Sequence, residues 1–590
     1  MMTELANKAE SKPEIILRFQ RLGKDADFDA PIPASVHFDG ADTESFSFTN
    51  PLSDKDLAEL RWYLEHYWQW PSDIDDERAR NVEGSLPKWG KALLDAVILK
   101  SPEAMRLFGR FSEADGERVL TIDTTEPRIL RLPWELLRDE SGYLFSEQVS
   151  VRRRMHKVRT QNIQPFNLPV RILMVTCRPD GAGFIDPRSI STPLLDALDA
   201  LPEQFEVEFL RPPTLTALDA RLRDESLPRV HIVHFDGHGV YDKGVGLGFL
   251  LFEDDEFQMH RVDAEQLGTL LNRSGIPLMV LNACQSAQPD ERNPFASVAS
   301  RLIESGVGGV VAMNYSVLVE TAKRFTKDFY GALARGQSAG AALDSARRSL
   351  FSDTRRLTFQ RPHEDESVIV HLQDWFLPAL YQQADELRPF APDSLPASAG
   401  SGAAADGKLT GFPPPPLHGF HGRARELLDL ERAFAARGIL VLHGFGGQGK
   451  TSLAAQAAEW FSRTRLFERA VFLSFEHGLS FETVLHQIGN ALVAENFQIY
   501  EGDKVQAIAD ALRAQPALLV FDNFESALPG GNAPMPELQD LLNAAAKWFP
   551  PLTPDTRHPA PDTPHCSSPP ATRTSRTRLS ALARTACTKN

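Results

Sequence analysis

Two residues that could act together in covalent catalysis each follow an apolar run of the sequence. His238 comes after residues 230–235, and Cys284 comes after residues 276–281. An imidazole that removes the proton from a nearby thiol leaves a thiolate, which attacks carbonyl carbons. If the two runs are neighbouring parallel strands, their carboxyl ends bring both residues to one edge of a sheet. The spacing therefore predicts a cysteine nucleophile with a histidine base.

The residues beside this pair suit the same chemistry. The tetrahedral intermediate of acyl transfer carries an oxyanion that needs backbone N–H donors. Gly239 has no Cβ to obstruct a substrate, so its N–H and that of Cys284 are the expected donors. Each residue alone has a plainer interpretation, because a cysteine after a strand is most often a small buried hydrophobic residue. The combination and order of His-Gly and Ala-Cys favour catalysis, and Asn-Ala-Cys-Gln-Ser is close to the signature around the caspase cysteine.

Other reactive residues in this region are expected to be structural. Cys177 also ends an apolar run, but no His-Gly pair accompanies it. His231 and His234 lie three positions apart on a predicted strand and therefore face opposite sides of the sheet. We expect no metal site there, and none elsewhere in a structural role.

A second chemical motif lies near residue 450. Residues 444–451 read Gly-Phe-Gly-Gly-Gln-Gly-Lys-Thr, between a predicted strand at 439–442 and a predicted helix at 452–463. This is a phosphate-binding loop in its required context, with backbone N–H groups around phosphate oxygens at a helix N-terminus. Lys450 is expected to neutralise the β- and γ-phosphates of ATP, and the Thr451 hydroxyl to bind Mg²⁺. The predicted nucleotide-binding residues are Gly444, Gly446, Gly447, Gly449, Lys450, Thr451 and Ser452.

An acidic strand end supports the nucleotide site. The apolar residues 517–521 lead into Asp522, the position of a carboxylate that organises Mg²⁺. Glu525 could position a water molecule for hydrolysis, or could serve as an N-terminal carboxylate of a helix.

Hydrophobic patterning places these motifs in two α/β units. Strands at 172–177, 205–210, 230–235, 247–253, 276–281 and 309–314 alternate with helix-length segments, which predicts a mainly parallel sheet covered on both faces. Composition divides the chain into a first unit at 14–385, a Pro/Ala/Gly/Ser-rich linker at 386–417 and an incomplete P-loop unit at 418–552. The basic, Thr- and Pro-rich tail at 553–590 is expected to be disordered, and its abrupt change of character suggests a reading-frame shift.

Composition excludes several classes of protein. The chain has 590 residues and a formal charge of −16, which disfavours binding to nucleic acid or to anionic membranes. Four cysteines exclude a disulfide scaffold, and no apolar run is long enough to cross a membrane. We expect a cytoplasmic protein. The basic run Arg152-Arg153-Arg154 is interpreted as a solvated face rather than a nucleic-acid site.

The first unit resembles the CHAT domain, the bacterial branch of the caspase-like peptidases related to separase. The resemblance covers most of residues 14–385 and rests on segments 230–241, 280–284 and 306–312, with further matches at 132–137 and 375–381. It implies a caspase-type α/β fold and a cysteine endopeptidase with His238 as base and Cys284 as nucleophile. Many relatives cleave beside a basic residue, so Asp236 and Asp242 are candidates for an acidic specificity pocket. Both could instead form turns.

The second unit, over about 418–552, is similar to NB-ARC/NACHT-type signal-transduction ATPases of the STAND class. Phe-x-Gly-Arg at 420–423, the P-loop and Leu-Val-Phe-Asp-Asn-Phe-Glu at 519–525 carry this similarity. The sensor arginine, winged helix and repeat array of that family are not visible, so nucleotide binding is the safer expectation and hydrolysis stays open.

The leading hypothesis is a cysteine peptidase that acts on a protein substrate and is regulated by ATP, with protomers assembling on activation. One alternative is a signalling ATPase whose caspase-like part is a non-catalytic interaction module. Another is a gene remnant with a working peptidase and an inactive switch.

Overall fold

The computed structural model describes residues 12–22, 30–69, 72–155, 166, 168–199, 204–242, 247–285, 294–315, 317–360, 367–383, 387–388, 409–417 and 419–549. The predicted tail at 553–590 and most of the predicted linker at 386–417 lie outside these residues. In the described ranges, no helix is both long and apolar enough to cross a membrane.

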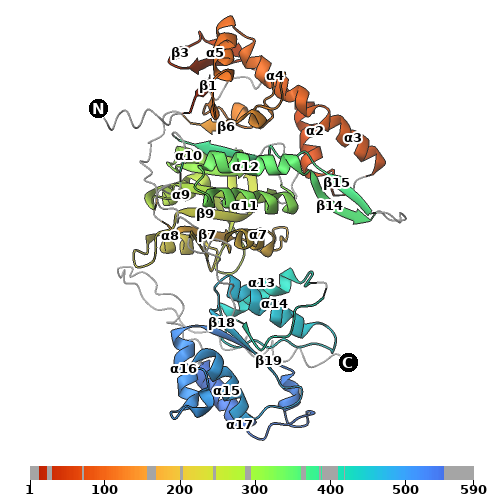
Figure 1. Cartoon of the computed structure of the whole chain (residues 1–590), viewed down its shortest axis with the longest axis vertical. Helices are drawn as coiled ribbons and strands as arrows, with labels where there is room; N and C mark the ends of the chain where they lie inside the picture. The colour runs from red at the N-terminus through yellow and green to blue at the C-terminus, as the bar shows by residue number, and fades with distance from the viewer. Residues whose placement is uncertain are drawn as a thin grey trace, which may run out of the picture.

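The first unit is built on one large sheet, which has 14 strands within the described residues. Its core runs in the order β8–β7–β9–β12–β13–β16; the first five strands are parallel to one another, whereas β16 is antiparallel to β13. Figure 1 labels β7 and β9 of this core. The bounds are β7 (Val170–Thr176), β8 (Phe205–Phe209), β9 (Ile232–Asp242), β12 (Leu278–Gln285), β13 (Gly309–Met313) and β16 (Pro378–Gln382). The predicted α/β class with a mainly parallel core is confirmed.

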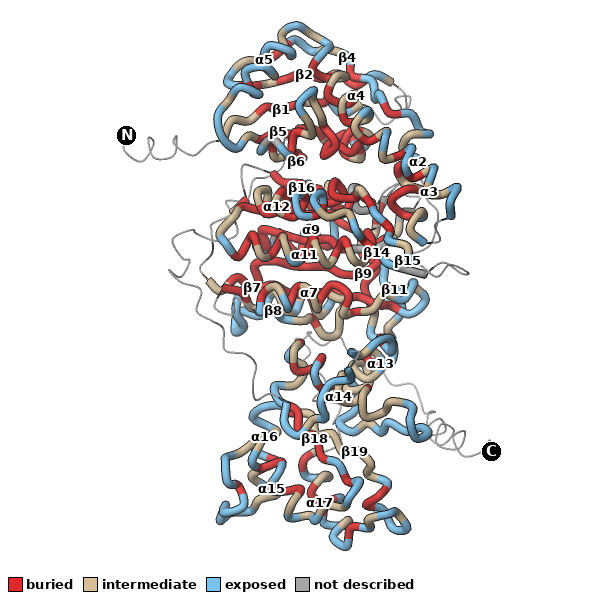
Figure 2. The backbone as a smooth tube through the Cα atoms, turned by 45° about the vertical axis from the view of Figure 1, so that its right-hand side comes forward, coloured by how far each residue is buried: buried red, intermediate tan, exposed pale blue. Residues whose placement is uncertain are grey.

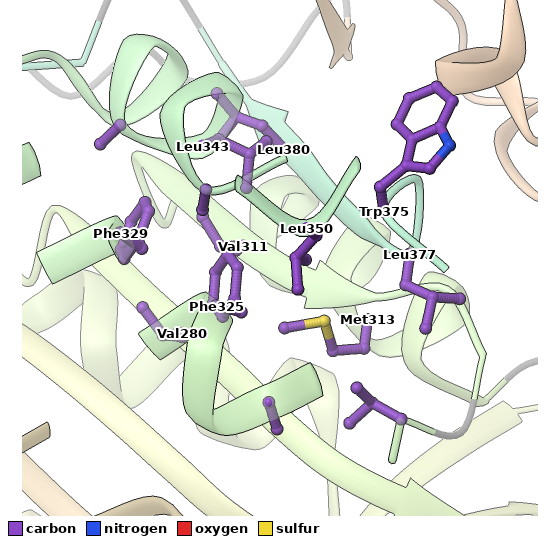
Figure 3. Packing of buried hydrophobic residues seen from close by; sticks show 14 of the residues in the cluster. Val280, Val311, Met313, Phe325, Phe329, Leu343, Leu350, Trp375, Leu377 and Leu380 are labelled. Atoms are coloured by element: carbon purple, nitrogen blue, oxygen red, sulfur yellow. The ribbon is translucent and has the colours of Figure 1, made fainter. Parts of the chain in front are cut away.

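Helices cover both faces of this core, as the alternation of strands and helices predicts. On one face of the sheet, odd-numbered residues of β7 and β9 such as Leu173 and Phe235 pack with α8, α9 and α10. On the other face, even-numbered residues such as Met174 and Ile232 pack with α7, α11 and α12. Figure 3 shows the second of these layers, where Phe325 and Phe329 lie over Val280 and Val311. The bounds are α7 (Arg188–Leu198), α8 (Leu215–Arg223), α9 (Ala264–Arg273), α10 (Pro294–Glu304), α11 (Val319–Ala334) and α12 (Ala339–Ser352).

β9 is longer than the sequence indicates. Instead of ending at residue 235, it continues to Asp242 because the hairpin of β10 (Leu247–Glu253) and β11 (Met259–Asp263) supplies a new partner. β7 pairs with residues 232–236 of β9, and β10 pairs with residues 238–242 along the same edge. His238 therefore lies inside a strand rather than in the turn after it.

The amino-terminal residues extend the sheet through β6, whose last residues pair with β16. The bounds in this extension are β1 (Glu14–Phe19), β2 (Ile32–Phe38), β3 (Ala41–Asp42), β4 (Phe46–Phe48), β5 (Arg118–Asp123), β6 (Val149–Arg154), α2 (Asp54–Glu65), α3 (Asp73–Glu83), α4 (Leu86–Ile98), α5 (Pro102–Ser112) and α6 (Pro127–Leu130). A further hairpin joins β14 (Arg355–Gln360) and β15 (Ser367–His371). Figure 2 shows that buried residues concentrate along the strands of the first unit and the helix faces against them.

The basic run at 152–154 is not a solvated face, so that interpretation is wrong. Arg153 is fully buried and forms a two-bond ion pair with Glu135, of which the Nη2–Oε2 contact is 3.1 Å. Arg347 of α12 approaches the same carboxylate at 3.2 Å and pairs with Asp344 at 3.0 Å. Glu135 belongs to the Leu-Pro-Trp-Glu-Leu-Leu segment, so this motif joins β6 to α12 through buried charge.

The second unit is a smaller α/β structure. Its three-stranded sheet runs β17–β18–β19 with parallel pairing, and β17 lies inside the predicted linker. The bounds are β17 (Leu409–Thr410), β18 (Arg469–Ser474), β19 (Ala517–Asp522), α13 (Ala424–Phe434), α14 (Lys450–Arg463), α15 (Phe481–Leu492), α16 (Lys504–Ala514) and α17 (Leu538–Trp548). The strand predicted at 439–442 is absent: these residues have no strand partner, and Val441 is 80% exposed.

We expect Glu135→Gln to lower the stability of the full chain by about 3–5 kcal/mol, because it leaves Arg153 and Arg347 buried without their shared counter-charge. Urea-induced unfolding followed by tryptophan fluorescence measures this change. The matched control is Glu140→Gln, which removes an exposed partner of Lys91. Equal transition midpoints for the two variants would contradict a role of Glu135 in holding the first unit together.

Candidate active site and nucleotide-binding site

The strands that carry His238 and Cys284 are adjacent and parallel, as the sequence predicts. In the pairing of β9 with β12, Cys284 is the register partner of His238, and Gln285 is that of Gly239. Neighbouring parallel strands lie about 4.8 Å apart, and register partners share a face of the sheet. The backbone therefore brings the thiol-bearing and imidazole-bearing positions side by side at the carboxyl edge of the core.

His238 is covered by the chain segment between β7 and α7. Only 2% of His238 is exposed. Gly183, in the middle of this segment, lies so close that a Cβ added to it would be 3.8 Å from the imidazole Cε1 of His238. We call residues 178–187 the covering segment. In this structure the imidazole has very little open access to solvent.

Arg178 holds the covering segment onto β9. Its Nη1 donates to the carbonyl of Asp236 at 2.7 Å, and its Nη2 donates to the Asp236 carboxylate at 2.6 Å. Its Nε donates to the carbonyl of Ile185 at 2.9 Å, which closes the segment into a compact loop. Sequence reasoning missed Arg178, since Cys-Arg-Pro-Asp-Gly signals only a turn.

The two aspartates proposed for a specificity pocket lie in different environments. Asp236 is buried; burial raises its pKa, and the ion pair with Arg178 lowers it, with a net rise. That pairing favours a structural role for Asp236. Asp242, at the end of β9, is partly exposed and lies 3.4 Å from Arg261. Gly239 lies between β10 and β12, so its backbone groups point towards neighbouring strands.

The remaining reactive residues of this region are part of the core. Burial, followed by the nearby Glu253 carboxylate, raises the pKa of the Cys177 thiol well above its usual range. Burial lowers the pKa of His234 to about 3, and its Nδ1 is 2.9 Å from the hydroxyl of Tyr330. His231 instead stacks on Phe166, so the two histidines face different surroundings.

The P-loop at 444–451 joins directly to α14, whose N-cap is Gly449. Gly447 and Gly449 have φ values of 76° and 75°, in the left-handed region that favours glycine. A Cβ added at Gly446, Gly447 or Gly449 would meet nothing within 4 Å, so open space lies against the loop. Lys450 directs its ammonium group to the carbonyls of Gly444 and Phe445, at 2.9 and 3.2 Å.

The acid of β19 meets the P-loop. Thr451 donates a hydrogen bond from its hydroxyl to Asp522 at 2.9 Å, which brings together the two side chains expected to organise Mg²⁺. Ser452 follows in α14, and Glu525 is exposed in the short helix after β19. These residues fit a nucleotide triphosphate with its Mg²⁺, because open backbone N–H groups, an ammonium and an Mg²⁺-type oxygen pair converge.

Arg423, in the Phe-x-Gly-Arg motif, also belongs to this site. Its Nη2 donates to the carbonyl of Gln448 in the P-loop at 2.6 Å. The Phe-x-Gly-Arg motif singles out Arg423 in the sequence, but only the fold shows that Arg423 holds the P-loop.

Comparisons with known proteins agree with this arrangement. The CHAT domain model matches residues 89–381, and the NB-ARC domain model matches residues 425–526. A search of the curated proteins found no match. 

Solved structures show distant likeness. A chain of the Saccharomyces cerevisiae separase–securin complex has 10% identity and a TM-score of 0.35, and the match covers 64% of this chain and 30% of that chain. A secreted C11 cysteine protease from Bacteroides thetaiotaomicron, in complex with an irreversible peptide inhibitor, has 9% identity and a TM-score of 0.24. That match covers 32% of this chain and 60% of the protease. Both family models match in the predicted order, so the chain contains a CHAT domain followed by an NB-ARC domain.

Proposed function

We propose that this protein is a cysteine endopeptidase of the caspase-like type whose activity is controlled by ATP at the NB-ARC domain. The observation that carries the proposal is the register of β9 and β12, which pairs His238 with Cys284. Cysteine and histidine at adjacent positions on one sheet edge are the minimum apparatus for thiolate attack on a peptide.

In the proposed reaction, His238 accepts the Sγ proton of Cys284, and the thiolate adds to the carbonyl carbon of the scissile peptide. Of the two oxyanion donors that the sequence suggests, the N–H of Cys284 is the one proposed here, because Gly239 lies within the sheet between β10 and β12. His238 then returns the proton to the departing amine, and the C–N bond breaks to leave a thioester on Cys284. Water, deprotonated by His238, hydrolyses the thioester and restores the thiol.

The proposed substrate is a protein cleaved beside a basic residue. Asp242 supports this preference better than Asp236, because Asp236 is buried against Arg178, whereas Asp242 is partly exposed and its ion pair with the exposed Arg261 is longer, at 3.4 Å. The proposed place of action is the cytoplasm, with neither a membrane nor a nucleic acid as partner.

The NB-ARC domain is proposed to bind ATP with Mg²⁺. Gly444, Gly446, Gly447 and Gly449 would surround the phosphates, Lys450 and Ser452 would contact them, and Thr451 with Asp522 would hold the metal. Bound ATP would supply a cleavable phosphoanhydride. We propose Glu525 as the residue that would orient the attacking water, its alternative role being an N-terminal carboxylate of the short helix after β19. We propose that the loaded domain assembles protomers and thereby activates the peptidase.

One observation favours a second candidate. His238 is 2% exposed, as expected of a site that is latent or not used. A signalling NB-ARC ATPase with a CHAT domain that serves only as an interaction module would have such a site.

Labelling of the full chain with peptide acyloxymethyl ketones separates the two candidates. With Arg or Lys next to the reactive group, and with Mg²⁺-ATP present, we expect covalent labelling that Cys284→Ala and His238→Ala both abolish. Cys177→Ala is the matched control and should label normally, because the protonated, buried Cys177 thiol is a poor nucleophile. Labelling of Cys284→Ala at the wild-type level would refute the peptidase assignment.

We expect Lys450→Ala to weaken binding of Mg²⁺-ATP to the full chain by at least about tenfold, equivalent to about 1.4 kcal/mol, because it removes the charge opposite the phosphates. Isothermal titration calorimetry measures the affinity. Lys547→Ala, which removes an exposed lysine of α17, serves as the control. Equal affinities for the two variants would show that the P-loop does not bind nucleotide.

A further inference from the structure

The CHAT domain contains a pocket that holds a guanidinium group from the NB-ARC domain. Arg432 of α13 places Nη1 3.1 Å from Asp180 and Nη2 3.2 Å from Glu253. Its Nη2 also donates to the carbonyl of Arg178 at 2.8 Å, and the guanidinium carbon lies 4.4 Å from the ring centroid of Phe257. Two carboxylates, a carbonyl and an aromatic face are the groups that recognise arginine.

Glu253 is a buried carboxylate whose ion-pair partner is Arg432. Only 2% of Glu253 is exposed, and burial raises its pKa, while the backbone N–H of Arg178 and the charge of Arg432 lower it. The guanidinium of Arg178 is already engaged with Asp236. A buried carboxylate that loses its counter-charge is strongly destabilised, so the pocket favours an occupied state.

The pocket lies beside the candidate active site. Glu253 ends β10, two residues beyond Leu251, which is the register partner of His238. Side chains two residues apart on a strand share a face, so Glu253 is on the same face as His238. Arg432 therefore fixes the start of the covering segment while Gly183, further along, lies over the imidazole of His238.

Other residues of the second unit contact the covering segment or the residue just after it. The guanidinium of Arg425 lies 4.7 Å from the ring centroid of Phe184. Just after the segment, Arg188 donates to the carbonyl of Gly422 at 3.4 Å and lies 5.9 Å from the ring centroid of Phe420. Figures 1 and 2 both show α13 next to the lower edge of the CHAT sheet, near α7.

The helix that carries Arg432 is also tied to the P-loop. α13 follows Arg423, whose side chain donates to the P-loop carbonyl of Gln448. Arg432 is nine positions after Arg423 along α13, which corresponds to a rise of about 14 Å. A displacement of the P-loop would thus move the arginine in the CHAT pocket.

We propose that Asp180, Glu253 and Phe257 form an arginine-binding site of the CHAT domain, and that Arg432 occupies it as an intramolecular latch that keeps the covering segment closed over His238. This inference rests on the proposed peptidase for its consequence, since release of Arg432 opens the active site. The ligand class is a guanidinium side chain, supplied here by the chain itself.

The test compares Arg432→Ala with Arg437→Ala in the full chain. Arg437 is an exposed arginine shortly after α13 and is the matched control for loss of charge. Two readouts are taken without nucleotide: hydrogen–deuterium exchange of residues 178–187, and the rate of labelling by the arginyl acyloxymethyl ketone. For Arg432→Ala we expect about tenfold faster exchange and labelling, as a loss of about 1.4 kcal/mol would give. Arg432→Lys, which keeps the charge but not the paired hydrogen bonds, should lie between.

The outcomes separate the latch from the proposed function. Faster exchange in Arg432→Ala, with no labelling of any variant either without nucleotide or after Mg²⁺-ATP is added, supports the latch and rejects the peptidase. Labelling that is equal in all variants, with unchanged exchange, supports the peptidase and overturns the latch. Unchanged exchange in a folded Arg432→Ala protein, judged by its circular dichroism spectrum, overturns the latch in every case.

Discussion

The parallel pairing of β9 with β12 is the constraint on which the rest of the structure depends. It sets Cys284 beside His238, and a slip of one residue would turn one of them to the other face of the sheet. Helices on both faces prevent such a slip, since Ile232 and Phe235 are each buried in a different hydrophobic layer. β9 also changes partner from β7 to β10 along its other edge, which extends the strand through the candidate site.

On one face of β9, every second residue from Ile232 to His238 is buried, and these side chains need increasingly polar partners. Ile232 needs only apolar contact, while His234 stays neutral beside the hydroxyl of Tyr330. Asp236 needs a counter-charge, which Arg178 provides. His238 comes last, beneath the covering segment that Arg178 itself anchors. The covering segment thus neutralises Asp236 through Arg178 and also screens His238 from solvent. The site can open only if the part of the segment over His238 moves separately from Arg178.

Local sequence patterns predicted the features that a single apolar run or a short motif encodes. The apolar runs indicated the strands. Two motifs indicated that Thr451 and Asp522 would serve one Mg²⁺ although they are 71 residues apart, because each motif has its own recognisable sequence. Charge pairing between residues outside any such motif was not predictable. Arg153 was expected in solvent because nothing in the sequence of β6 indicates that Glu135, 18 residues earlier, pairs with it. Residues 439–442 have the composition of a strand, but they have no strand partner. The pocket of Arg432 combines two separate segments, residues 178–180 and 253–257, and has no local signature.

The contact between the two domains is built mainly from arginines and acids. A small apolar centre, where Trp460 packs with Leu195, is bordered by partly exposed ion pairs such as Arg463 with Asp196. Exposed pairs of this kind stabilise a contact by about 0–1 kcal/mol each. The contact between Arg432 and Glu253 differs, because its carboxylate is buried and a broken buried pair leaves an uncompensated charge. We therefore expect loss of the Arg432–Glu253 contact to cost more than loss of any one of the exposed pairs. A movement of α13 would therefore weaken the contact where a buried charge needs its partner, while the apolar packing of Leu195 with Trp460 would remain.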